Sequence, residues 1–256
     1  MEWTVERDYA REALPKRDPE GHKGTFGEVL ALAGSVGYTG AAWLAAEGAV
    51  RGGCGLVHLG VPEDIWPVEA VKCTSAMPFP LAAEDGGLSL RALEGIREKL
   101  ARCDVLALGP GLGRRAETAE LIRRLLSETE KPAVLDADGI NALAGHIDIL
   151  DGRRGRVTVL TPHEGEFFRA GGDLSRGRES GAAAYAARRG VYLVLKGRGT
   201  VVAAPDGVST AVNSAGSTDV PCTYGLSAMV VRVSGVVCLT TGSMTAPSVF
   251  AGFTEK

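Results

Sequence analysis

The sequence lacks any run of about twenty apolar residues, so we expect no transmembrane helix. Its first eighteen residues are charged throughout and contain no apolar core of the kind a secretory signal peptide needs. The chain of 256 residues also lacks an excess of basic charge, because its net charge is −3. These absences argue against a membrane or nucleic-acid partner, and we expect a cytoplasmic protein.

Cysteine is sparse, and its spacing suits no shared site. None of the thiols forms a CxxC pair, so the spacing gives no sign of zinc or redox chemistry. We expect reduced thiols throughout. A Walker A motif, GxxxxGK[ST], is also absent. The five cysteines are Cys54, Cys73, Cys103, Cys222 and Cys238.

Glycine is abundant, with 35 residues, and many of them follow short apolar runs. These runs predict buried strands over 29–34, 55–61, 105–109, 132–137, 157–162 and 191–197. Helical spacing is found over 40–50, 90–100, 116–128 and 180–190, and the proline-containing segment between 61 and 90 reads as irregular. Residues 200–212 predict two strands around an Asp-Gly turn. Strands that alternate with helices in this way indicate an α/β fold with a parallel sheet covered on both faces.

Five loops with polar or glycine-rich sequences follow the predicted strands: AGSVGYTG, GPGLG, DADG, TPHEGE and KGRGT. In parallel sheets, ligands bind beyond the carboxyl ends of the strands, so we expect these loops to share one rim. GPGLG at 109–113 is suited either to a phosphate or sugar against its amides or to a tight turn. The short HKG stretch at 22–24 is equally open between a phosphate contact and a surface lysine.

The charged residues of the later loops each allow a functional and a structural interpretation. Asp136 and Asp138 suit Mg²⁺ held through water or the acceptance of a proton, whereas Asp138 alone would also suit a helix cap. His163 is suited either to a hydrogen bond with the substrate or to a structural role. Glu166 is suited to holding water molecules around a metal ion. Lys196 is suited either to binding a polyphosphate or to an exposed position in a surface hairpin. Their joint placement favours an enzyme that acts on a phosphate-rich substrate.

Several stretches together resemble one family, the ADP- or ATP-dependent NAD(P)H-hydrate dehydratases of the ribokinase-like superfamily. They are HKGTFGEVLALAGSVGYTGAA, ALGPGLG, VLDADGINAL, TPHEGEFFRAGG and LKGRGTVVAAPDG, in the family's order. The similarity runs from about residue 14 to about residue 212, and HKG to GYTGAA and TPHEGE are its specific parts. It implies a ribokinase-like three-layer αβα fold with a mostly parallel central sheet, in one domain over 1–256.

The resemblance also implies a reaction, its cofactors and its residues. A phosphate of ATP or ADP, with Mg²⁺, would be transferred to the hydroxyl of hydrated NADH or NADPH, and its elimination would restore the dihydropyridine. A tetramer is the implied assembly. Substrate contacts would come from Ala41, Gly111, His163 and Asp219; nucleotide contacts from Lys196, Gly197, Arg198, Gly199, Thr200 and Thr218; and metal or phosphate contacts from Asp136 and Glu166, with Asn141 nearby.

The segment 213–256 departs from the family's pattern. The family has a GGSGD-type loop whose amides form an anion hole and whose aspartate is the base, and GSTD at 216–219 aligns Asp219 with that base. Thr218 replaces a glycine there, and its β-branched side chain crowds the approach to phosphate. The valine-, threonine- and glycine-rich residues that follow form a poor helix and favour strands. We therefore expect an atypical or rearranged segment and impaired activity.

Two other functions fit the same residues. A ribokinase-like kinase for a hydroxymethylpyrimidine or thiazole alcohol would transfer phosphate without elimination. A catalytically impaired homologue would bind nucleotides without turnover, which the altered GSTD loop favours. TPHEGE and HKG favour the dehydratase over the kinase.

Overall fold

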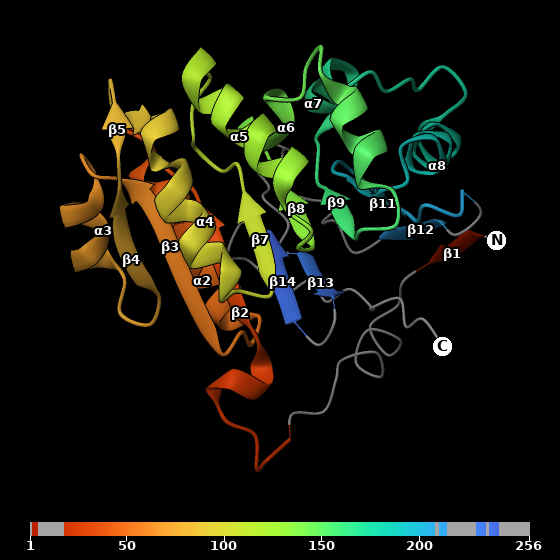
Figure 1. Ribbon diagram of the computed structural model, residues 1–256. Helices are drawn as coiled ribbons and strands as arrows, with labels where there is room; N and C mark the ends of the chain where they lie inside the picture. Colours follow the sequence, from red (N-terminus) through yellow and green to blue (C-terminus); the bar gives the residue numbers. More distant parts are fainter. Residues whose placement is uncertain (1, 5–17, 208–209, 214–228, 234–235, 241–256) are drawn as a thin grey trace.

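The computed structural model describes residues 2–4, 18–207, 210–213, 229–233 and 236–240 (Figure 1). A ten-stranded sheet lies at its centre, and every neighbouring pair is parallel except the two that involve β11. The mostly parallel sheet is therefore confirmed. In spatial order the strands are β1 (Glu2–Thr4), β12 (Thr210–Asn213), β11 (Thr200–Ala203), β10 (Tyr192–Leu195), β9 (Thr158–Leu160), β8 (Ala133–Leu135), β7 (Val105–Leu108), β2 (Glu28–Leu32), β3 (Leu56–Pro62) and β4 (Met77–Leu81).

The four predicted helices are confirmed to within a few residues. Gly190 ends α8 in the left-handed conformation that glycine adopts readily, with φ 67° and ψ 36°. Within the described ranges, no helix is both long and apolar enough to cross a membrane. The helices are α2 (Thr39–Arg51), α3 (Trp66–Lys72), α4 (Leu93–Ala101), α5 (Ala116–Glu128), α6 (Asp138–Asn141), α7 (Glu164–Arg169) and α8 (Arg178–Arg189), with 3₁₀ turns η1 (Lys23–Phe26), η2 (Leu90–Ala92) and η3 (Ile147–Arg153).

The segment between 61 and 90 is regular, so the prediction of an irregular stretch was wrong. It contains α3, β4 and the short pair β5 (Ala83–Glu84) and β6 (Gly87–Leu88). Its prolines are compatible with these elements because of where they lie. Pro67 is in the first turn of α3, where a helix needs no amide donor. Pro78 and Pro80 are in β4, which is an edge strand.

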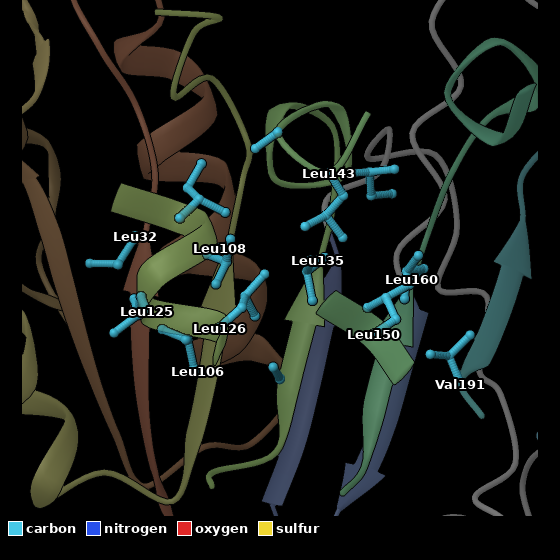
Figure 2. Packing of buried hydrophobic residues seen from close by; sticks show 14 of the residues in the cluster. Leu32, Leu106, Leu108, Leu125, Leu126, Leu135, Leu143, Leu150, Leu160 and Val191 are labelled. Atoms are coloured by element: carbon cyan, nitrogen blue, oxygen red, sulfur yellow. The ribbon is translucent and has the colours of Figure 1, made fainter. Parts of the chain in front are cut away.

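The two faces of the sheet carry different side chains because each strand alternates them. Leu30, Leu106 and Leu193 lie in one core cluster, whereas Val29, Val105 and Val194 lie in the other. The leucine face packs beneath α4, α5, α7 and α8, and Figure 2 shows leucines of the strands meeting leucines of α5. The opposite face, built from valine and alanine, packs against α2.

Helix α2 approaches the sheet through small side chains. Ala42, Ala46 and Ala49 are buried at a spacing of four and then three residues, which places them on one side of the helix. A hairpin of β13 (Met229–Val233) and β14 (Val236–Thr240) lies on the same side of the molecule, with β14 against α2 (Figure 1). The strands in this hairpin agree with the expectation of strand-prone sequence after residue 213, most of which lies outside the described ranges.

A buried arginine joins α5 to the starts of β8 and β9. Arg153 is 1% exposed, and its guanidinium donates to the carbonyl oxygens of Leu126 (2.9 Å), Thr129 (2.7 Å) and Lys131 (2.8 Å) and to Thr158 Oγ1 (3.0 Å). Burial lowers the pKa of Arg153 to about 10. The planar guanidinium therefore supplies hydrogen-bond donors to several backbone carbonyl groups at the carboxyl end of α5 and in the residues after it.

We expect Arg153→Lys to lower the free energy of unfolding by about 2–3 kcal/mol, because lysine leaves buried carbonyl groups without donors. The exposed Arg102 provides the control, and Arg102→Lys should change stability by less than about 0.5 kcal/mol. Urea unfolding followed by circular dichroism measures both. Equal midpoints for the two variants would contradict the bridging role of Arg153.

Candidate functional site

The five polar loops meet at one edge of the sheet, as predicted. Strands β2, β7, β8, β9 and β10 run in the same direction, so their carboxyl ends lie together. The loops that follow them start at Ala33, Gly109, Asp136, Thr161 and Lys196. We call this edge the rim.

Hydrogen bonds connect the first three loops of the rim. The amide of Gly34 donates to Pro110 O (2.8 Å), and the hydroxyl of Ser35 donates to Gly111 O (2.7 Å). The amide of Gly113 donates to Asp138 Oδ2 (2.9 Å). The loops after β2, β7 and β8 therefore form one continuous structure.

Glycine is required in GPGLG by close contacts with neighbouring loops. Gly109 has φ 131°, and a Cβ there would lie 1.8 Å from Asp136 O. A Cβ on Gly111 would lie 2.8 Å from Ala41 Cβ. Ala41 and Gly111, both predicted to contact substrate, are therefore neighbours, and the tight-turn interpretation is correct at least for Gly109.

A buried charged pair lies at the centre of the rim. Asp136 Oδ1 accepts from Lys196 Nζ at 2.7 Å and from Thr161 Oγ1 at 2.7 Å. The side chains of Asp136 and Lys196 are 6% and 16% exposed. Lys196 N also donates to Pro162 O (2.8 Å). Lys196 is therefore no surface lysine, and it links the loops that follow β8, β9 and β10.

Glu166 supplies a second carboxylate beside Lys196. Its Oε2 lies 3.9 Å from Lys196 Nζ and accepts from the His163 amide at 2.9 Å. In return, the Glu166 amide donates to His163 Nδ1 at 3.3 Å, which makes a capping box at the start of α7. The side chain of Glu166 is 7% exposed and that of His163 is 54% exposed. His163 thus has a structural role at its Nδ1, and its Nε2 lies 3.2 Å from Glu166 Oε1 at the half-exposed side of the ring.

Asp138 does not cap α6, so the capping interpretation was wrong. The helix begins at Asp138 itself, and Ala137 at the cap position makes no side-chain cap bond. Asp138 instead accepts from the Gly113 amide and, at 3.1 Å, from Asn141 Nδ2. Asn141 Oδ1 in turn accepts from Arg169 Nε at 2.8 Å. Asp138 and Asn141 therefore connect the GPGLG loop, α6 and α7.

Ala137 carries backbone strain between the two aspartates. Its φ of 48° and ψ of −113° lie in a region that residues with a Cβ rarely adopt. The turn directs Asp136 toward Lys196 and Asp138 toward Gly113. Strain of this kind costs about 1–3 kcal/mol and persists where the surrounding contacts fix the backbone.

Arg178 is a residue of the rim that the sequence pattern did not reveal. Its Nη2 donates to Leu195 O (3.1 Å) and Lys196 O (3.2 Å), and its Nη1 pairs with Glu164. A Cβ on Gly197 would lie 2.7 Å from Arg178 Nη2. Arg178 therefore supports the KGRGT loop, in which Thr200 Oγ1 also donates to Gly197 O (3.2 Å). Its position at the start of α8, far from any motif, offered no local signal.

Three predicted residues or segments are not brought into the described rim. The HKG stretch precedes β2 and lies at the opposite edge, where Gly55 N donates to Gly27 O (3.0 Å) at the start of β3. It therefore lies apart from the rim, and its interpretation as a phosphate contact stays a prediction. Thr218 and Asp219 lie outside the described residues.

The rim suits a magnesium ion that is held mainly by phosphates. Asp136 and Glu166 offer two buried carboxylates, but Asp136 Oδ1 already accepts two hydrogen bonds, one from an ammonium. Among the described residues, the rim contains no group of three side chains with metal-ligand spacing. Mg²⁺ commonly keeps several waters and takes one or two carboxylates beside substrate phosphates, which fits this donor set.

Comparisons with known proteins agree on one family. Residues 29–222 match the family model described as NAD(P)H-hydrate dehydratase. The bifunctional NAD(P)H-hydrate repair enzyme Nnr of Moorella thermoacetica is 45% identical over 78% of this chain, a match that spans 38% of the relative's length. The ADP-dependent (S)-NAD(P)H-hydrate dehydratase of Bacillus subtilis is 38% identical over 80% of this chain and 70% of its own.

Solved structures support the same fold. The Bacillus subtilis ADP/ATP-dependent NAD(P)H-hydrate dehydratase, co-crystallized with ATP/Mg²⁺, superimposes with a TM-score of 0.64 at 30% identity and covers 84% of this chain and 73% of its own. A ribokinase-like superfamily protein from Enterococcus faecalis gives a TM-score of 0.70 at 20% identity, with coverage of 84% and 72%. The ribokinase-like three-layer fold is thereby confirmed.

We expect Lys196→Met and Asp136→Asn each to lower the free energy of unfolding by about 3 kcal/mol, because each leaves its buried partner without a counter-charge. A double-mutant cycle should give a coupling energy of about 2 kcal/mol or more. The exposed pair of Arg51 and Glu47, one turn apart in α2, is the control and should couple by less than about 0.5 kcal/mol. Additive effects of Lys196→Met and Asp136→Asn in denaturant unfolding would show that the contact does not stabilise the rim.

Proposed function

The chain belongs to the NAD(P)H-hydrate dehydratase family, and from that premise we propose that it converts the (S)-hydrate of NADH or NADPH back to the reduced dinucleotide. ADP or ATP supplies the phosphoryl group. The chain matches less than half of the length of the bifunctional relatives, so the activity proposed here is that of the dehydratase part alone. The reaction repairs a nicotinamide ring that has lost its use as a hydride donor.

The observation that carries this proposal is the rim with its buried charged centre. A single edge of the sheet combines glycine loops, which let phosphates approach the backbone, with the Lys196 ammonium beside Asp136 and Glu166. A reaction between a dinucleotide substrate and a second nucleotide needs an extended binding surface of this kind. The solved relative that was co-crystallized with ATP/Mg²⁺ supports the use of a nucleotide.

The proposed reaction has two stages. The terminal phosphoryl group moves to the hydroxyl of the hydrated ring: an O–P bond forms, the bond to the ADP or AMP leaving group breaks, and the hydroxyl proton passes to a base. Phosphate then leaves with the C–O electron pair, and a proton leaves the neighbouring ring carbon. Phosphate is a far better leaving group than hydroxide, so phosphorylation makes the elimination possible.

We assign the two molecules to different parts of the rim. The segment from Lys196 to Thr200, supported by Arg178, lies along the nucleotide. Ala41 and Gly111, which are neighbours, form with His163 the contact surface for the hydrated dinucleotide. His163 is half exposed, and Glu166 holds its ring in place through contacts to both Nδ1 and Nε2.

Asp136 and Glu166 are the residues that would hold Mg²⁺, by contacts to its bound waters. A bound Mg²⁺ would neutralise charge on the phosphates during transfer. Lys196 donates to Asp136 at 2.7 Å, which orients this carboxylate without a metal. Lys196 would also meet an incoming phosphate as a compact positive charge.

Asp219 is the proposed base, with Gly216 and Ser217 as the remaining amide donors of the loop. We expect Asp219→Ala to reduce kcat by about 100-fold or more, since general bases contribute 10²–10⁴-fold. The assay follows the recovery of dihydropyridine absorbance from hydrated NADH or NADPH with ATP or ADP and Mg²⁺. Asp148→Ala, at an exposed position in η3, is the control and should keep full activity.

Full turnover by Asp219→Ala would remove Asp219 from the role of base. A stable phosphorylated product without recovery of absorbance would indicate a kinase in place of a dehydratase. Tight nucleotide binding with no turnover of either kind would indicate an impaired binding protein.

Thr218 is expected to limit the rate, because its branched side chain occupies the position where the family's glycine lets phosphate approach the backbone. We expect Thr218→Gly to raise kcat by about tenfold, which corresponds to about 1.4 kcal/mol. Thr218→Ser removes only the methyl group and should give an intermediate gain. If all three proteins turn over at the same rate, the loop does not act as an anion hole in this chain.

A further inference from the structure

A second cluster of polar side chains lies at the opposite edge of the sheet from the rim. Glu28 is the first residue of β2, His58 is the third residue of β3, and Cys103 lies between α4 and β7. One ligand atom from each, a carboxylate oxygen, an imidazole nitrogen and the sulfur, lies within 4.8 Å of the other two. Among the residues that the structure describes, this is the one group of three with such spacing.

The strand pairing places these three side chains on the same face. Glu28 and Leu30 are two residues apart in β2 and so share a face, and Leu30 pairs in register with His58 of β3. Leu30 belongs to the core cluster that also contains Cys103. The amide of Asp104 donates to Glu28 O at 2.8 Å, and the Glu28 amide donates to Asp104 Oδ2 at 2.8 Å. These two contacts, one of them to the Asp104 side chain, hold the start of β2 beside the start of β7 at the cluster.

The donors and their spacing suit a tetrahedral transition-metal ion. Zn²⁺ takes histidine nitrogen, carboxylate oxygen and thiolate sulfur at about 2.0–2.3 Å, so its ligand atoms lie roughly 3.3–3.8 Å apart. His58 Nε2 and Glu28 Oε2 are 3.3 Å apart. Three protein ligands leave a fourth position for water.

The cluster is open to solvent on one side only. The side chains of Glu28 and His58 are 27% and 15% exposed, whereas Cys103 is fully buried. An ion would enter past Glu28 and His58 and meet the sulfur last. Cys103 follows the carboxyl end of α4, and its sulfur donates to Lys99 O at 3.3 Å, so the carbonyl end of that helix adds negative potential beside the site.

We propose that Glu28, His58 and Cys103 form a binding site for a divalent transition-metal ion of the Zn²⁺ type. The site is distinct from the rim, because the whole length of β2 separates the two edges, about 15 Å at the usual rise per residue. The ion would connect β2, β3 and the α4–β7 connection, three segments far apart in the chain. Its effect is therefore on stability and not on the chemistry at the rim.

The test uses the untagged full chain, freed of metal by a chelator and titrated with Co²⁺ as the probe. We expect a thiolate-to-cobalt absorption band that saturates at one equivalent, and a rise in melting temperature on addition of Zn²⁺. The band arises only from a sulfur bonded to cobalt, so it reports coordination by a cysteine.

Variants identify the ligands. Cys103→Ser should abolish the thiolate band, and His58→Ala and the nearly isosteric Glu28→Gln should each weaken Co²⁺ binding about tenfold or more. Glu28→Gln is the variant least disturbing to the fold, because its side chain is partly exposed. Cys54→Ser, at another buried cysteine, and Cys73→Ser are the controls and should keep the band. The absence of a band in the unmodified chain, or a band of equal strength in folded Glu28→Gln, would overturn the proposal.

Discussion

The contact between Lys196 and Asp136 is the interaction on which the arrangement of the rim depends. It joins the ends of β8 and β10 across β9, and Thr161 of the intervening loop donates to the same carboxylate oxygen. Because both side chains are largely buried, water solvates neither charge well, and each charge needs the other as its partner. The loops on either side are positioned relative to this pair: the strained turn at Ala137 leads to Asp138 and Gly113, and Arg178 fixes the carbonyl groups beside Lys196. The loops of the rim are thus joined by contacts within the chain itself.

The leucine and valine faces of the sheet explain why the rim can be this regular. The longer side chains on one face accommodate α4 and α5, whereas the small side chains of α2 let that helix lie close on the other. Because the two layers differ in depth, a strand shifted by one residue would exchange large and small side chains between them. The strand register that packs leucines on one face and small side chains on the other is also the register observed at the rim, where five strands end at the same edge.

The four longest helices and most strands of the central sheet could be predicted from hydrophobic spacing, because each of these segments is bounded by glycine, proline or charge. The loops of the rim could be predicted too, since parallel strands must end together. What pattern reasoning missed depends on contacts between distant segments. Arg178 supports the KGRGT loop from α8, Asp138 accepts from the Gly113 amide and does not cap α6, and β4 contains prolines that normally argue against a strand.

The prolines of β4 determine where the sheet stops. Pro78 and Pro80 are two residues apart, so their backbone nitrogens point the same way, and the pairing of β4 with β3 requires that direction to be outward. A strand from another molecule that approached this border would find two consecutive donor positions empty. A ten-stranded sheet could otherwise grow by adding strands from its neighbours. The two prolines that made β4 hard to predict from the sequence therefore protect the folded protein from aggregation along that border.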